Sequence, residues 1–218
     1  MADSLFTRLF SITDEQVMWR VKMQDDPQAF ARLVGRWEKP IQQLCARMTG
    51  DVHCGEDLAQ ETFARLFARR KDYEPAARFS TFLWRMALNL CYDELRKIQR
   101  RREWSLDPTG DDAEGTLDGI SASGPAPDAA LAEQERADAV RRALLQITEP
   151  YRVVVVLRHY EGLKFREIGE VLGIPEGTVK SRMAEALNQL SRILNPTLNE
   201  GQSVCKPPLP KPQASLTL

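Results

Sequence analysis

Residues 166–182 carry side chains whose types and spacing suit the reading of duplex DNA. Lysine and arginine can donate hydrogen bonds to guanine or phosphate, and glutamate can accept one from cytosine. Most of these groups follow Gly173, where one helical pattern stops and a longer one begins, so they lie near the exposed start of a second helix. The candidate duplex-contacting residues are Arg166, Glu176, Gly177, Thr178, Lys180, Ser181 and Arg182. The chemistry predicted here is recognition of base edges in a major groove.

The residues between these polar groups are expected to hold a helix-turn-helix unit together. Gly169 permits close packing of the first helix, Gly173 permits the turn, and Val179 anchors the second helix from inside. Ile168 and Leu172 are expected to face inward with them. An ordinary helical hairpin with solvated polar residues has the same pattern, so this motif alone leaves both interpretations open.

A second set of side chains, between residues 69 and 96, has the types that can hold an unpaired DNA strand. Such a surface needs cations along the strand, pockets or aromatic platforms for bases, and amides or hydroxyls for base edges. The candidate residues are Arg70, Lys71, Tyr73, Arg78, Phe79, Ser80, Thr81, Trp84, Arg85, Asn89 and Arg96. Phe79, Phe82 and Trp84 also suit a hydrophobic core, and for Phe82 the core is the favoured assignment.

Residues 57–67 combine a polar face with an apolar stripe on one predicted helix. The polar members are Asp57, Gln60 and Glu61, and the apolar members are Leu58, Phe63, Leu66 and Phe67. A helix of this kind can bind a partner helix through a mixed interface. Because the stripe equally suits the protein core, we assign the polar face to a partner and the apolar face mainly to the fold.

Helices are needed to position these residues, and apolar side chains recur at three- and four-residue steps in two blocks of the chain. Strand-like alternation is absent apart from residues 153–156, whose helical neighbourhood favours helix. The sequence therefore predicts an all-α protein of two small helical domains, residues 1–102 and 131–195. A flexible acidic linker, residues 103–130, joins them, and a disordered proline-rich tail, residues 196–218, follows.

Turn and capping residues predict where the helices of the first block begin and end. The first long pattern continues past Pro40 and stops at Gly50, and Asp51 restarts the next helix. Ser80 or Thr81 is expected to cap the third helix of this block.

Composition and spacing argue against several other classes of protein. An enzyme needs converging acids, bases, nucleophiles or metal ligands, but the chain has only two histidines and no strand-loop phosphate site. No cofactor or metal is expected, and His53 beside Cys54 is assigned to incidental surface chemistry. The four cysteines lack CxxC spacing, nothing resembles a signal peptide, and no apolar run approaches the roughly 20 residues that span a bilayer. A cytoplasmic protein without membrane insertion is predicted.

Two ordered sets of motifs resemble one family of proteins. In the second block they are PYR at 150–152, LRHYEGL at 157–163, EIG at 167–169 and GTVKSR at 177–182. In the first block they are DDPQAF at 25–30, LV at 33–34, EDLAQETF at 56–63 and the whole of 79–96. The second set resembles region four, and the first set region two, of the extracytoplasmic-function sigma factors of the sigma-70 family.

This resemblance implies a role in starting transcription. The first domain would bind core RNA polymerase through the helix at 57–67 and capture the melted minus-ten non-template strand with the set at 70–96. The second domain would read minus-thirty-five duplex DNA with the set at 166–182, while polymerase performs the chemistry. An anti-sigma factor is an expected further partner. The family usually has tryptophan in place of Phe82 and tyrosine in place of Trp84, which leaves open which ring meets DNA.

Two other functions compete with this interpretation. A polymerase-independent helix-turn-helix regulator explains residues 150–195 but not the motifs of the first block. A helical adaptor without a DNA role predicts no promoter-dependent activity with core polymerase, and no loss of function on changing Lys180 or Arg182.

Overall fold

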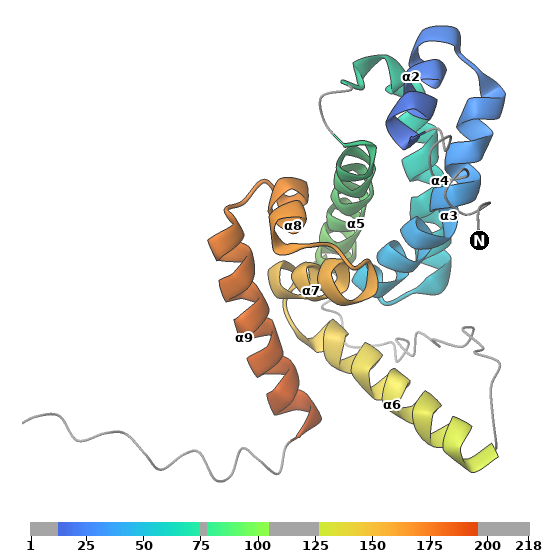
Figure 1. The fold of residues 1–218 in the computed structure, drawn as a ribbon. Helices are drawn as coiled ribbons and strands as arrows, with labels where there is room; N and C mark the ends of the chain where they lie inside the picture. Colours follow the sequence, from blue (N-terminus) through green and yellow to red (C-terminus); the bar gives the residue numbers. More distant parts are fainter. Residues whose placement is uncertain (1–12, 75–77, 105–126, 196–218) are drawn as a thin grey trace, which may run out of the picture.

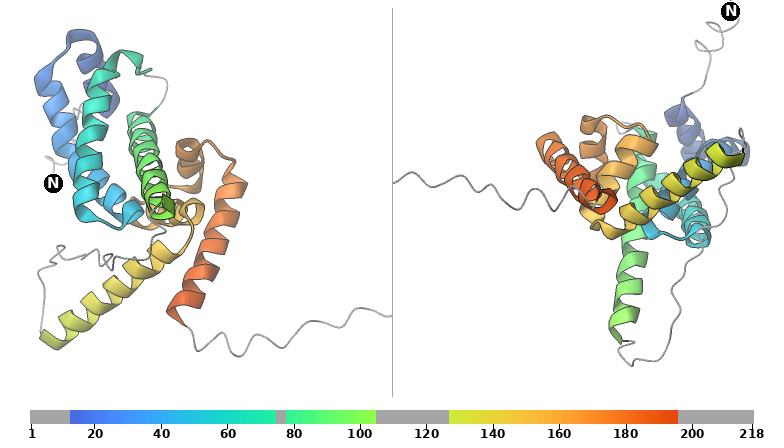
Figure 2. Two further views of the ribbon diagram at one scale, coloured as in Figure 1. Left: turned by 180° about the vertical axis from the view of Figure 1, so that it is seen from behind. Right: turned by 90° about the horizontal axis from the view of Figure 1, so that it is seen from below.

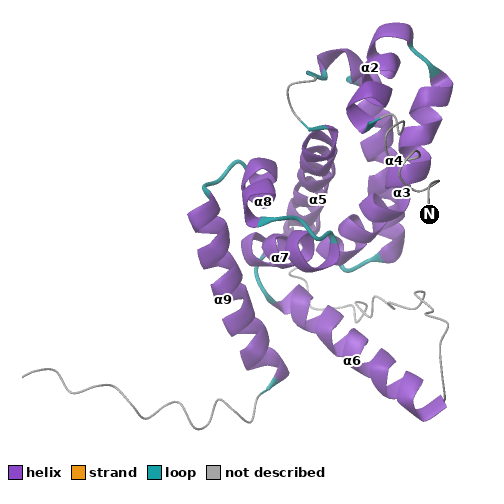
Figure 3. Cartoon of the chain, viewed as in Figure 1, coloured by secondary structure: helices purple, strands orange, loops and turns teal. Residues whose placement is uncertain are grey.

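A computed structural model describes residues 13–74, 78–104 and 127–195, and every regular element in these ranges is a helix (Figures 1 and 3). The first block contains α2 (Asp14–Gln24), α3 (Pro27–Thr49), α4 (Val52–Ala68), the short η1 (Arg70–Asp72) and α5 (Phe79–Trp104). The second contains α6 (Pro127–Gln146), α7 (Glu149–Val155), η2 (Val156–Tyr160), α8 (Phe165–Leu172) and α9 (Glu176–Leu194). The predicted all-α fold class is confirmed. No helix within the described ranges is both long and apolar enough to cross a bilayer.

Two helices extend into the segment predicted as a linker, residues 103–130. Helix α5 runs to Trp104, and α6 begins at Pro127. Proline suits the first turn of a helix because its backbone angle is already helical and its missing N–H has no partner to lose there. The rest of the predicted linker and the whole predicted tail, residues 196–218, lie outside the described residues.

Side chains at the helix starts define the elements of the first block. Thr13 and Gln16 form a capping box at α2, while Asp26 and Asp51 accept backbone N–H bonds at the starts of α3 and α4. Gly50 ends α3 with a φ of 83°, a left-handed conformation that favours glycine. The predicted stop and restart at this point are confirmed.

The predicted cap of α5 is wrong. This helix already begins at Phe79, whose backbone N–H donates to the Glu15 carboxylate at 3.1 Å. The acceptor comes from α2, far away in the sequence, so Ser80 and Thr81 lie inside the helix. Local sequence could not identify a cap that tertiary packing supplies.

One apolar core joins α3, α4 and α5 in the first block. Its fully buried members include Leu33, Ile41, Leu44, Met48, Leu66 and Leu83. Helices α3 and α4 cross closely at Gly55, where an added Cβ would lie 2.7 Å from the backbone nitrogen of Ala46. Because that distance is well below van der Waals contact, the crossing requires a residue without a side chain.

The centre of the second block is the continuous segment of α7 and η2. Residues 153–157 are each at most 4% exposed. The turn at Val156–Tyr160 is π-helical, and the N–H of Glu161 donates to the carbonyl oxygen of Val156 at 3.3 Å. This turn is one residue wider than an α-helical turn, and no pattern in the sequence indicated it.

The two blocks lie against each other, with α8 beside α5 and α7 beside the end of α3 (Figures 1 and 2). Arg152 of α7 is 7% exposed at this boundary. Its guanidinium donates hydrogen bonds of 2.9 to 3.1 Å to three carbonyl oxygens around the end of α6. These are the carbonyl oxygens of Leu144, Leu145 and Ile147. It also donates to the carbonyl oxygen of Met48, near the end of α3. The buried Arg152 guanidinium therefore forms hydrogen bonds with both blocks.

Candidate nucleic-acid interface

Helices α8 and α9 and the turn between them form the predicted helix-turn-helix unit. Gly173 has a φ of 68°, and its N–H donates to the carbonyl oxygen of Gly169. An added Cβ on Gly169 would lie 2.8 Å from the carbonyl oxygen of Ile174, so the turn packs directly on a residue without a side chain. Ile168 and Val179 are fully buried, as their inward-facing roles require.

The polar start of α9 is largely exposed to solvent. Glu176, Gly177, Lys180 and Ser181 are exposed, as is Arg166 on α8, while Thr178 and Arg182 are half-buried. Lys180 and Glu176 form a 2.7 Å ion pair one turn apart, and Arg166 pairs with Glu170 at 3.3 Å. Exposed ion pairs of this kind contribute little stability, so another anion can replace the carboxylate. The cations are available to a phosphate or a base.

Arg182 lies close enough to the first block for its charge to act on a residue of α5. Burial is the main reason why the pKa of Tyr92, on α5, rises to about 12, and the positive charge of Arg182 acts in the opposite direction. Arg166 and Glu176 also line one pocket together with Arg85 of α5, so this set borders the first block.

Helix α4 separates its polar and apolar residues onto two faces. Asp57, Gln60 and Glu61 are exposed, whereas Leu58, Phe63 and Leu66 are buried. Phe67 is 38% exposed, with its ring edge-on to Phe30 at 5.1 Å and beneath the Arg70 guanidinium at 4.3 Å. The apolar stripe therefore serves the fold, and the polar face remains open.

A groove of about 740 Å³ runs between α4 and α5 beside this polar face. Its lining combines apolar Leu58 and Leu90 with charged Glu61, Arg65 and Arg96. A surface of this mixed character suits contact with another protein better than it suits a small apolar ligand.

The aromatic rings expected to stack on bases are mostly in the core. Tyr73 and Phe79 are 0% exposed and Trp84 is 3% exposed. Trp37 of α3 meets Phe79 at 6.1 Å and Trp84 at 5.5 Å, both edge to face, and Tyr73 meets Phe82 at 5.6 Å. The structure therefore favours the core assignment of Phe79 and Trp84, which the sequence left open, and corrects the expectation that the Tyr73 ring is accessible. Phe82, for which the core was the favoured assignment, is partly buried and packs against the core.

Arg70 and Lys71 of the predicted single-strand set share one protein anion. They contact the Asp25 carboxylate at 2.5 and 3.3 Å, and the bond from Arg70 is the main reason why the pKa of that carboxyl is lowered. Elsewhere in the set, Arg78, Arg85, Asn89 and Arg96 are exposed, and Ser80 and Thr81 are half-buried.

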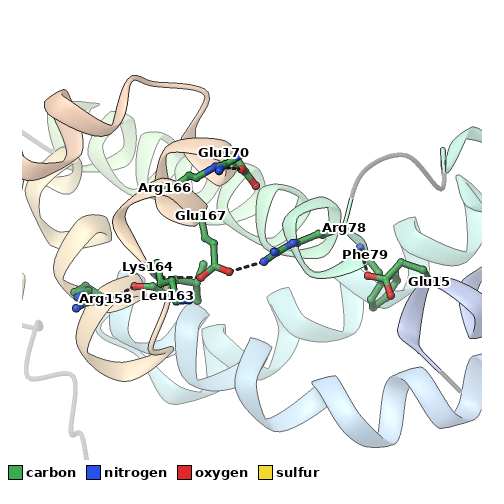
Figure 4. Close-up of polar contacts among 9 residues, drawn as sticks. All are labelled: Glu15, Arg78, Phe79, Arg158, Leu163, Lys164, Arg166, Glu167 and Glu170. Carbon is green, nitrogen blue, oxygen red and sulfur yellow. Dashed lines mark hydrogen bonds and ion pairs between the residues drawn. The ribbon is translucent and has the colours of Figure 1, made fainter. Parts of the chain in front are cut away.

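The remaining two arginines near the start of α5 contact the second block. Arg78 forms an ion pair with Glu167 of α8 (Figure 4). The Nε of Arg85 donates to the carbonyl oxygen of Val171 at 3.1 Å, and its Nη2 donates to that of Glu170. Glu167 lies in the motif EIG, but no sequence pattern indicates this contact, which joins residues far apart in the chain.

Comparison with known proteins identifies the class to which this arrangement belongs. A model described as Sigma-70 region 2 matches residues 33–102, and one described as Sigma-70, region 4 matches residues 137–190. The first match contains the exposed faces of α4 and α5, and the second contains the helix-turn-helix unit. The fold and site are those of a transcription initiation factor of the sigma-70 family.

Individual relatives narrow this class further. The ECF RNA polymerase sigma factor SigW of Bacillus subtilis (strain 168) is 37% identical over 171 residues, which cover 78% of this chain and 90% of that protein. The RNA polymerase sigma-H factor of Pseudomonas aeruginosa is 31% identical over 192 residues, covering 86% and 96%. The chain belongs to the extracytoplasmic-function sigma factors, and the resemblance read from its motifs is confirmed.

Two solved structures share the fold at 22% sequence identity. CnrH in complex with the cytosolic domain of CnrY aligns with a TM-score of 0.61 over 84% of this chain and 97% of that chain. The sigma factor RpoE in complex with the anti-sigma factor NepR from Bartonella quintana aligns with a TM-score of 0.57 over 76% and 96%. Both support the helical architecture described above.

Family membership decides between the broad classes of function. Sigma factors start transcription without catalysing a reaction themselves, so the chain is not an enzyme. A polymerase-independent helix-turn-helix regulator leaves the match over residues 33–102 unexplained. An adaptor without a DNA role leaves both matches unexplained.

Proposed function

We propose that this chain binds core RNA polymerase in the cytoplasm and selects promoters with two surfaces. The start of α9 reads the minus-thirty-five duplex, and the exposed side of α5 holds the melted minus-ten non-template strand. The observation that carries the proposal is the solvent-exposed polar start of α9 in an intact helix-turn-helix unit. Side chains placed there can enter a major groove and reach base edges.

Transcription in vitro tests this function directly. Core polymerase is mixed with the purified chain and a library of promoter fragments, and the start sites are sequenced. We expect a subset of promoters to be used only when the chain is present. Purified chain that neither associates with core polymerase nor changes the choice of start sites would contradict the proposal.

The double alanine variant of Lys180 and Arg182 is expected to weaken upstream duplex recognition. Each good side-chain contact to a base contributes about 1–3 kcal/mol of discrimination, so loss of both lowers affinity for the upstream duplex about tenfold or more. Footprinting of the polymerase complex measures this loss. The matched control replaces Arg136 and Arg142, exposed on α6, with alanine, which removes the same charge. Equal losses in both variants would show a general charge effect instead of recognition by α9.

Support for the minus-ten surface comes from the side chains that remain exposed on α5. Arg78 and Arg85 supply cations for a DNA backbone, and Asn89 supplies an amide for a base edge. The half-buried hydroxyls of Ser80 and Thr81 lie along the same helix. Since the other rings are covered, Phe82 becomes the candidate aromatic contact in the conformation described here.

The exposed polar face of α4 and the adjoining groove support polymerase binding. Alanine at both Asp57 and Glu61 is expected to weaken binding to core polymerase about tenfold. Charged groups of the polymerase that pair with these two carboxylates would remain buried in the interface without a partner. Titration of labelled chain against core polymerase measures the change. Alanine at Glu38 and Glu135, exposed carboxylates on α3 and α6, is the matched control and should have little effect. Unchanged affinity of the α4 variant would remove this face from the interface.

An anti-sigma factor is proposed as the third partner, after core polymerase and promoter DNA. The two solved structures with this fold contain CnrY and the anti-sigma factor NepR, respectively, as bound partners. A partner of this kind would act by covering the faces of α4, α5 and α9 that the proposal assigns to polymerase and DNA.

A further inference from the structure

We propose that α8 masks the single-strand face of α5 in the free chain, with the Glu167 carboxylate in the place of a DNA phosphate. The inference rests on the proposed function of Arg78 and Arg85, and it concerns the chain before polymerase and DNA bind. In this closed state the protein blocks one of its own DNA surfaces without a separate inhibitor.

The first contact that carries the inference joins Arg78, directly before α5, to Glu167 on α8 (Figure 4). Glu167 also accepts the backbone N–H of Lys164 at 2.8 Å, which fixes the carboxylate at the start of α8. This backbone bond, followed by the contact with Arg78, lowers the pKa of Glu167 and keeps the carboxylate ionised. The guanidinium therefore meets a fixed negative charge, as it would on a phosphate.

The second contact places Arg85 on the other end of α8. Its guanidinium donates to the carbonyl oxygens of Glu170 and Val171. The last carbonyl groups of a helix have no partner within the helix and carry partial negative charge. Arg78 lies directly before α5 and Arg85 seven residues further on, about two helical turns, so both lie on the same side of this segment. The single short helix α8 binds both cations.

Beside the contact of Arg78 with Glu167, both blocks line one open pocket. A pocket of about 320 Å³ is lined by Ser80, Thr81 and Trp84 from α5 and by Glu161 and Leu163 from the second block. The hydroxyl groups assigned to base edges thus open toward the second block. In this arrangement the second block restricts the approach of a DNA strand to them.

Contacts outside the proposed DNA set hold the two blocks closed. Arg47 of α3 pairs with Glu161 at 3.4 Å, and these side chains are only 21% and 8% exposed. The Arg47 guanidinium also lies 4.1 Å from the centre of the Tyr160 ring. A cation over an aromatic face contributes more as it loses water, so this cluster is a second anchor beside Arg152.

The test uses the full chain and opens the closed state without touching a proposed DNA contact. Glu167→Gln removes the charge but retains an acceptor for the Lys164 N–H. Arg47→Ala and Arg152→Ala remove the two anchors, and the three changes are combined, with circular dichroism used to check that the helices remain. Glu170→Gln is the control, because the Glu170 side chain pairs with Arg166 and only its backbone carbonyl meets Arg85.

Two properties of the free chain are measured. Small-angle X-ray scattering gives the radius of gyration, and fluorescence anisotropy gives the affinity for a short fluorescein-labelled single-stranded DNA. We expect the combined variant to be larger than wild type and to bind the strand about threefold to tenfold more tightly, in keeping with the small contribution of each partly exposed pair. The control should match wild type in both measurements.

Either of two outcomes would overturn the inference. One is a combined variant as compact as wild type with the same affinity, and the other is an opened chain that binds the strand no better. The scattering sample contains no DNA, so the radius of gyration reports on closure of the free chain even if the proposed function is wrong. Promoter-directed transcription with core polymerase reports on that function even if the free chain is not closed.

Discussion

Alanine in place of Arg152 is expected to lower the free energy of unfolding of the full chain by about 3 kcal/mol. The guanidinium donates to four carbonyl oxygens, including that of Met48 in the other block, and is 7% exposed. Each buried acceptor left without a donor costs about 1–3 kcal/mol, and partial access of water reduces the sum. Burial lowers the pKa of Arg152, but the surrounding carbonyl groups compensate the buried cation.

Urea denaturation followed by circular dichroism measures this loss. Arg142→Ala, at an exposed position on α6, is the control and should change the free energy of unfolding by less than about 0.5 kcal/mol. A loss below about 1 kcal/mol for Arg152→Ala would show that water satisfies the four carbonyl groups without the guanidinium.

Valine in place of Gly55 is expected to destabilise the first block by about 3 kcal/mol. The Cβ atom would lie 2.7, 2.8 and 2.9 Å from the N, Cβ and Cα atoms of Ala46. Two of these atoms are backbone, so the clash is relieved only if α3 and α4 separate along their crossing, and overpacking of this kind costs about 1–3 kcal/mol or more.

A substitution at Gly35 in α3 is the matched comparison and is expected to change the stability in the opposite direction. An added Cβ there has nothing within 4 Å. Gly35→Ala should therefore stabilise the chain by about 0.5–1 kcal/mol, because alanine loses less conformational freedom in a helix. Thermal unfolding of both variants measures the change in melting temperature. Melting temperatures that both rise or both fall would contradict the prediction.

Features that depend on neighbours along the chain could be predicted from the sequence. The helices of both blocks follow from the spacing of apolar residues, and the end of α3 follows from Gly50 and Asp51. The packing roles of Gly169, Gly173 and Val179 follow from the short turn that joins two helices.

Features that depend on long-range contacts could not be predicted in this way. Tyr73, Phe79 and Trp84 have the residue types of a stacking surface, and their burial depends on contacts made in the fold, such as those of Trp37 on α3 with Phe79 and Trp84. Arg152 is satisfied by backbone oxygens, which every residue carries, so no particular residue type marks its partners. The contacts of Arg85 with α8 are also made to backbone oxygens, so no residue type in the sequence indicates them.

The wide turn at Val156–Tyr160 holds one extra residue in the segment that leads from α7 to α8 and α9. A π-helical turn contains one residue more than an α-helical turn, so loss of one residue here would restore ordinary winding and change the direction of the following chain little. Loss of one residue from the regular part of α7 would instead rotate everything after it by about 100° about the helix axis, and would move Tyr160 and Glu161 away from Arg47. The connection between α7 and α8 therefore accommodates a change in length at this turn better than anywhere else in α7.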